Sequence, residues 1–212
     1  YKAKASPAEP LVAYAGDFDG DDRHDLAIGY HQNGVLYPVF DRSYALSQNR
    51  GVAERVPDNQ SYAVASLEDI FGEENLERCA RHQMQTLATS YFENLGDGRF
   101  RMQPLENWTQ ISVVNSIVVA DANSDGYQDF IMAGNLHTME VRTVRLDGSI
   151  GAFFRGEGNG NFTYEPNGTS GLLIDGDVRR MELLNIQGAR HLIVAKNNDA
   201  VQIIKFEIPS LP

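Results

Sequence analysis

Two acidic loops of one design, each followed by an apolar run, constrain the fold of this chain more than any other feature. They occupy residues 17–25 and 121–129. In both loops, side chains with oxygen atoms stand at the first, third, fifth and ninth places: Asp17, Asp19, Asp21 and Asp25 in one, and Asp121, Asn123, Asp125 and Asp129 in the other. Since the spacing occurs twice, a chance pair of solvated Asp/Gly turns is a poor explanation for it.

Such a loop offers the ligands of a hard divalent cation. Ca²⁺ takes about six to eight oxygens at roughly 2.3–2.6 Å, and alternate residues of a loop curled around the ion can supply them. At the seventh places, the backbone carbonyls of Arg23 and Tyr127 add one oxygen to each set. An EF-hand would need a bidentate Glu at the twelfth place, where this chain has Ile28 and Met132. The sequence therefore predicts two Ca²⁺ sites outside the EF-hand class.

The composition of the chain limits the classes of partner that it can bind. The chain has 212 residues, of which 42% are hydrophobic, and no apolar run approaches the roughly 18 residues of a membrane span. The net charge of −11 argues against nucleic acid or an anionic membrane as partner, because both bind basic surfaces. The single cysteine, Cys79, excludes an internal disulfide and is expected to be a small buried side chain. Because the first residue is Tyr1 and not Met, we expect a processed or truncated piece of a longer chain.

Short β-type runs surround the loops, and one region differs from them. Strands are expected at 11–15, 26–30, 34–40, 82–92, 111–120 (buried), 141–146, 191–195 and 200–206, with tight hairpins turning at 94–98 and 156–160. Between residues 41 and 84 the chain is richer in Glu, Gln, Arg and Ala, and Ser66 to Asp69 have the spacing of a capping box. Residues 41–84 are therefore predicted to form a helical insertion packed on one face of a β domain.

A degenerate third loop is expected between Leu172 and Leu184. Asp175 and Asp177 supply acidic side chains there, but Arg179 and Arg180 occupy the interior and break the spacing. We expect this copy to have lost its ion, with a guanidinium in place of the cation, although the sequence leaves open whether metal binds near Asp175 and Asp177.

The repeated unit predicts an all-β fold built as part of a β-propeller. Each unit is a hairpin, a strand into an acidic loop, and a strand out of it that ends in glycine. At about 40–60 residues per four-stranded blade, about three to four blades fit, which is at or below the number that closes a ring. Residues 1–212 are thus expected to be the C-terminal part of a propeller, completed by further blades or by another protein chain.

The loops and several later motifs resemble a known family. Asp17 to Gly29 and Asp121 to Gly134 resemble FG-GAP/VCBS repeats, the calcium-loop blades of integrin α-subunit heads and of many bacterial exported proteins. Tyr62 to Phe71, Tyr91 to Asn94 and Gly96 to Phe100 are similar to the C-terminal region of the ASPIC/UnbV-associated VCBS group common in Bacteroidota. The chain departs from the pattern at Asp22, where the loop usually has glycine. The resemblance implies an exported or outer-surface propeller with structural Ca²⁺.

Two functions follow as expectations. The first is a calcium-binding extracellular module that acts as a binding or scaffold component of a larger surface protein. The alternative is a glycan-binding, lectin-like or polysaccharide-degrading propeller, in which Trp108, Tyr91 and Tyr127 stack on sugar rings, although core packing is the preferred role for Trp108. An enzyme is not expected, because no Ser/His/Asp set can be recognised and the five histidines are scattered.

Overall fold

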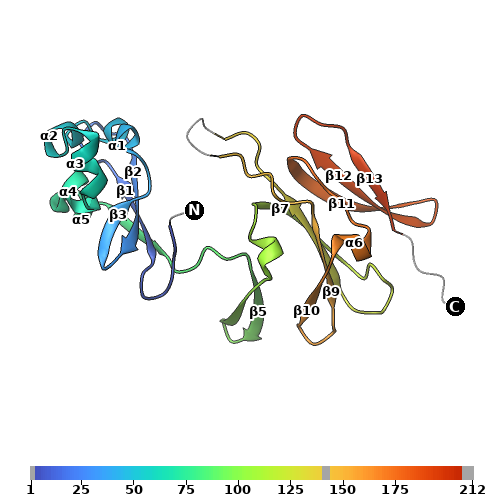
Figure 1. Ribbon diagram of the computed structural model, residues 1–212. Coiled ribbons are helices and arrows are strands. Elements are labelled where there is room, and N and C mark those ends of the chain that lie inside the picture. The colour runs from blue at the N-terminus through green and yellow to red at the C-terminus, as the bar shows by residue number, and fades with distance from the viewer. Residues whose placement is uncertain (1–2, 140–143, 207–212) are drawn as a thin grey trace. The chain divides into compact units, whose positions relative to one another are not determined.

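The computed structural model describes residues 3–139 and 144–206 (Figure 1). It is mostly β, with four antiparallel sheets, which confirms the sheet-rich class predicted from the sequence. The chain divides into two compact units, Tyr1–Leu87 and Ala88–Pro212. Among the described residues, no helix has the length and apolar character that crossing a bilayer requires.

The first unit holds one sheet and five short helices. The sheet has the order β3-β2-β1-β4, with bounds β1 Leu11–Gly16, β2 Asp25–Gln32, β3 Val35–Pro38 and β4 Ala80–Met84. The helices are α1 Arg42–Gln48, α2 Val52–Arg55, α3 Asn59–Val64, α4 Leu67–Phe71 and α5 Glu73–Glu77. Within the region 41–84, the helical part thus ends at Glu77, and the last residues form β4, which pairs with β1.

The core of this unit is built mainly by the helices. Val52, Leu67 and Ile70 are fully buried in it. Phe18, from the first acidic loop, joins this core, and its ring lies 5.0 Å from that of Phe71. Cys79 packs at the edge of the same cluster, half-buried, and burial raises the pKa of its thiol. The first acidic loop is therefore anchored in the helical core.

The capping box predicted at Ser66 is present. The Ser66 hydroxyl accepts a hydrogen bond from the Asp69 backbone N–H at 3.1 Å, and the Asp69 carboxylate accepts one from the Ser66 N–H at 2.8 Å. Gly72 then ends α4 with φ of +85°, a value that glycine adopts without a steric penalty. A helix of five residues is too short to be stable by itself, so its ends and its buried face must both be satisfied.

The second unit holds the other three sheets. Their orders are β10-β9-β8-β7, β11-β12-β13 and β5-β6. The strands are β5 Ser90–Gly96, β6 Arg99–Pro104, β7 Val114–Ala120, β8 Asp129–Gly134, β9 Ala152–Gly156, β10 Phe162–Glu165, β11 Val178–Ile186, β12 Ala189–Lys196 and β13 Gln202–Lys205. In the first two of these sheets, strands that follow one another in the sequence are neighbours.

Several strand predictions need correction. Residues 82–92 do not form one strand: β4 ends at Met84 and β5 begins at Ser90. The strand expected to be buried at 111–120 is β7, which begins at Val114 and exposes Ile117 and Val119, because these side chains lie on the face of the strand that is turned to solvent. Of the strand expected at 141–146, residues 141–143 lie outside the described residues, and Leu146 makes only an isolated bridge to Leu136.

The capping box yields a prediction. Replacing Ser66 with alanine (Ser66→Ala) should lower the free energy of unfolding by about 1 kcal/mol at neutral pH, since an N-cap hydroxyl is lost. Hydrogen bonds from the Ser66 side chain and backbone lower the pKa of Asp69. That carboxylate therefore stabilises the fold above its unfolded-state pKa, and this contribution is lost as the pH falls through the folded-state pKa.

Urea unfolding of both proteins at a series of pH values checks this. The difference between wild type and Ser66→Ala should shrink in acid. A difference that stays constant down to the pH at which Asp69 is protonated would contradict the role given to the Ser66–Asp69 pair.

Candidate metal centres

The first acidic loop is folded around the carboxylate of Asp17. One of its oxygens, Oδ1, accepts backbone hydrogen bonds from Gly20 at 2.7 Å and Asp21 at 3.2 Å, and Oδ2 accepts one from Asp22 at 3.0 Å. The loop thereby curls back over its first residue. Carboxylate oxygens of Asp17, Asp19 and Asp21 lie within 4.8 Å of one another on the exposed side of the loop. This group could hold a metal ion.

The second loop repeats several hydrogen bonds of the first at the same places. Asp121 accepts from the backbone N–H of Asp125 at 3.1 Å and of Gly126 at 3.0 Å. The fifth-place carboxylate accepts from the seventh-place N–H in both loops, at 3.0 Å from Arg23 to Asp21 and at 2.9 Å from Tyr127 to Asp125. Two segments about a hundred residues apart therefore share one backbone path, which is what the repeated spacing predicts.

The backbone angles explain the departure at Asp22. The fourth and sixth places of both loops have positive φ: +79° at Gly20 and +62° at Asp22, and +63° at Ser124 and +90° at Gly126. Asp22 thus takes up the conformation that glycine has in the second loop, at some steric cost. The first loop thus keeps the turn geometry of the second with an aspartate at the sixth place.

The ninth-place carboxylates close both loops. Asp25 accepts a hydrogen bond from the Phe18 N–H, and Asp129 accepts one from the Ala122 N–H, each at 2.9 Å. Asp129 accepts a second from the Gly156 N–H on β9 at 2.8 Å. A Cβ at Gly156 would lie 2.1 Å from the Gln128 carbonyl oxygen, so only glycine allows this close approach. Asp129 thus joins its loop to the sheet as well as closing it.

In the first loop, the pKa values of Asp25 and Asp17 shift in opposite directions. Burial raises the pKa of Asp25, and the charges of Asp19, Asp21 and Asp17 raise it further, against the lowering effect of the Phe18 N–H. For Asp17, burial also raises the pKa, but the hydrogen bonds from four backbone N–H groups outweigh it and leave the pKa lowered. The first loop therefore concentrates negative charge that a cation at this place would neutralise.

In the second loop, neutral groups take part in the ligand set. The Asn123 amide donates to Asp125 at 2.9 Å and accepts from the Asp125 backbone N–H at 3.0 Å. Hydrogen bonds from the Tyr127 N–H and from Asn123 lower the pKa of Asp125. The structure thus brings Asp17, Asp19 and Asp21 together in the first loop, whereas Asp25 is not part of that group, and among the described residues no comparable group of three carboxylates occurs in the second loop. Arg23 and Tyr127, expected to ligate through their carbonyls, are exposed residues of these loops.

The segment expected as a third loop is built differently. Asp175 and Asp177 precede β11, and residues 178–184 lie within that strand, whereas β11 and β12 are joined by the turn at Gln187 and Gly188. The buried Asp177 carboxylate accepts from the Arg179 guanidinium at 2.9 Å. Lys196 binds Asp175 at 2.7 Å. A cationic side chain contacts each carboxylate, in line with the guanidinium expected there.

Helix α1 supports the first loop through contacts that sequence reasoning missed. Asn49, just after α1, is buried and donates from its amide to the Phe18 carbonyl at 3.2 Å. Gln48 accepts from the Leu26 backbone N–H at 2.8 Å. The partners are separated by 31 and 22 residues, so no local pattern connects them. The one signal was Phe18 itself, an aromatic side chain within an acidic loop.

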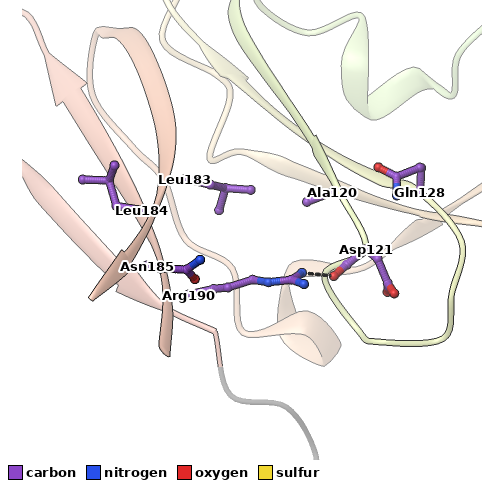
Figure 2. A pocket seen from close by; sticks show the side chains of 7 residues that line it. All are labelled: Ala120, Asp121, Gln128, Leu183, Leu184, Asn185 and Arg190. Atoms are coloured by element: carbon purple, nitrogen blue, oxygen red, sulfur yellow. Dashed lines mark hydrogen bonds between the residues drawn. The ribbon is translucent and has the colours of Figure 1, made fainter. Parts of the chain in front are cut away.

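Arg190 makes a corresponding contact with the second loop from a neighbouring sheet. Its guanidinium donates to the backbone carbonyl of Asp121 at 2.5 Å (Figure 2). Arg190 lies near the start of β12, far from the loop in sequence, and sequence reasoning gave it no role.

Comparisons of the chain with protein-family models, with curated proteins and with solved structures give no match.

The two closing contacts of Asp129 predict a large effect on stability. Asp129→Ala should lower the free energy of unfolding by about 2–4 kcal/mol, because it leaves the Ala122 and Gly156 N–H groups without their acceptor in a buried place. Asn123→Ala should cost less than about 1 kcal/mol, because Asn123 contacts only its own loop. Chemical denaturation in the presence of a chelator, which removes any contribution from metal, compares the two variants. Equal losses would contradict the closing role of Asp129.

Proposed function

We propose that this chain is a calcium-binding β-propeller module that acts as a binding or scaffold component of a larger extracellular or cell-surface protein. The observation that carries the proposal is the match between the two acidic loops in the hydrogen bonds from their fifth and sixth places to the first, and in their backbone angles at the fourth and sixth places. Oxygen-only ligands at this spacing suit Ca²⁺ better than softer metals.

The order of the strands supports the propeller. In one sheet, β7 enters the second acidic loop, β8 leaves it, and β9 and β10 follow in sequence across the sheet. β1 and β2 repeat this entry and exit around the first loop. β11, β12 and β13 form a third meander, with a tight turn in place of the acidic loop. Sequential four-stranded meanders around a repeated loop are the unit of a propeller blade.

The proposed extracellular location follows from the Ca²⁺ affinity expected of these loops. Exposed loops of this kind bind Ca²⁺ with the affinity of extracellular modules, which fill at about 10⁻⁴–10⁻³ M Ca²⁺. The sequence resemblance to exported FG-GAP/VCBS proteins of Bacteroidota points the same way. Ca²⁺ would neutralise the acidic loops and stabilise the fold, and the faces of the propeller would carry the binding.

Glycan binding is the second candidate, and exposed aromatic side chains favour it. Trp108 was expected to pack in the core, but it is 59% exposed and stacks on Tyr164 with a centroid separation of 6.0 Å. Tyr127, in the second acidic loop, is 49% exposed. Tyr91, by contrast, packs edge-on against Phe162. Exposed, rigidly held rings are the groups on which sugar rings stack.

Calcium should raise the melting temperature. Binding to the native state alone stabilises it by about 2.7 kcal/mol at a hundredfold excess of ligand over Kd. Thermal melts with a chelator, with Ca²⁺ and with Mg²⁺ measure this. Asp97→Asn, in the β5–β6 turn, serves as a control acidic residue and should respond to Ca²⁺ like wild type, whereas Asp21→Ala should respond less. A melting curve indifferent to both chelator and Ca²⁺ would remove the metal from the proposal.

The partner proposal rests on exposed apolar side chains. Val201 and Ile203, at the last strand, are 61% and 60% exposed, and Phe92 and Phe100, on the β5–β6 hairpin, are 57% and 60% exposed. Further blades or another chain would cover such surfaces. We therefore expect residues 1–212 alone to associate in sedimentation velocity experiments, and Ile203→Lys to reduce the association. A monodisperse monomer at all concentrations would show that these surfaces need no partner.

A further inference from the structure

A pocket lies beside the second acidic loop, within the second unit (Figure 2). Its volume is about 290 Å³, close to the roughly 300 Å³ at which pockets for small ligands begin. One wall comes from the ends of β7 and of the loop, and the other from β11 and β12. Besides Asp121, the lining residues are Ala120, Gln128, Leu183, Leu184, Asn185 and Arg190.

Of the residues that the structure describes, Arg190 is the only cationic one that lines this pocket. It is held in two ways: it stands opposite Asn185 in the register of β11 and β12, and its guanidinium donates to the Asp121 carbonyl. That contact uses one of the five N–H groups of a guanidinium. Among the described residues, the others have no acceptor, and Figure 2 shows the side chain extended along the pocket between Asn185 and Asp121.

The carboxylate of Asp121 does not compete for Arg190. Both of its oxygens accept backbone hydrogen bonds inside the loop, from Asp125 and from Gly126. In Figure 2 this carboxylate is turned away from Arg190, which meets the carbonyl instead. Among the described residues, the guanidinium therefore contacts the Asp121 carbonyl and has no carboxylate partner, and such a group can bind a planar carboxylate bidentately.

The other residues that line the pocket limit the kinds of ligand that it can bind. The carboxamides of Asn185 and Gln128 can each donate and accept hydrogen bonds, as hydroxyl groups require. Leu183 and Ala120 offer apolar contact to a C–H face. The net charge of −11 disfavours a dianionic phosphate more than a monoanionic carboxylate.

We propose that this pocket binds a small hydroxylated carboxylic acid of the size of one sugar ring, that is, a uronic acid. Its carboxylate pairs with Arg190, its hydroxyl groups with Asn185 and Gln128, and its ring C–H groups with Leu183. The site goes beyond the calcium proposal and requires no metal, since every group that it uses belongs to the protein.

The test is a titration of the full chain with glucuronate and, in parallel, with glucose, followed by ligand-observed NMR in a chelator and again in Ca²⁺. We expect roughly millimolar affinity for a single sugar ring, so the comparison matters more than the value. Glucuronate should bind at least about tenfold more tightly than glucose, because a charged hydrogen-bonded pair is lost with the neutral sugar.

Variants locate the site. Arg190→Gln should weaken glucuronate binding by about tenfold or more, and Asn185→Asp should do the same by placing a negative charge opposite Arg190 while leaving the arginine in place. The matched control is Arg99→Gln, which removes an exposed arginine of β6 and should bind like wild type. Circular dichroism and the Ca²⁺ response of the melting temperature show whether each variant keeps its fold.

Three results would overturn the proposal. These are equal binding of glucose and glucuronate, glucuronate binding that survives both Arg190→Gln and Asn185→Asp, and no binding of glucuronate by the folded wild type. None of these outcomes bears on Ca²⁺ at the acidic loops, which the thermal melts test separately.

Discussion

The carboxylate at the end of each acidic loop is the contact on which the rest of the structure depends. Asp25 and Asp129 are the first residues of β2 and β8, and they pair with Gly16 and Ala120, the last residues before the loops. Each also accepts the backbone N–H of the second loop residue. One side chain thus closes the loop and sets the register of the two strands that it joins. A slip of one residue would exchange the faces of the outgoing strand.

The same arrangement has an electrostatic cost. Like charges at about 4 Å repel by about 1 kcal/mol in water and by more in partly buried places. The first loop brings three exposed carboxylates together near the buried Asp25. The second loop has Asn123 in place of one of these charges, and Arg190 contacts its backbone. We therefore expect the first loop to depend more on a bound cation. The helical region, through Phe18 and Asn49, holds that loop in place.

The structural features that depend on residues close together in the sequence could be predicted. The acidic spacing predicted loops that share one backbone path, the capping box at Ser66 was correct, and the sheet-rich class followed from short β-type runs. Contacts between distant residues were not predictable. Three features depend on which segments become neighbours in the fold. They are the hydrogen bond from Asn49 to Phe18, the hydrogen bond from Arg190 to Asp121, and the exposure of Ile117. Asp175 and Asp177 suggested a third acidic loop, but these residues precede β11. The turn at Gln187 and Gly188 joins β11 to β12.

The central claim is that each acidic loop holds one calcium ion, and a calorimetric titration tests it most directly. The account predicts two Ca²⁺ ions per chain, and one ion per chain when either Asp21 or Asp125 is replaced by alanine, with the remaining site unchanged in affinity. A stoichiometry of zero, or a wild-type stoichiometry that neither replacement alters, would contradict it.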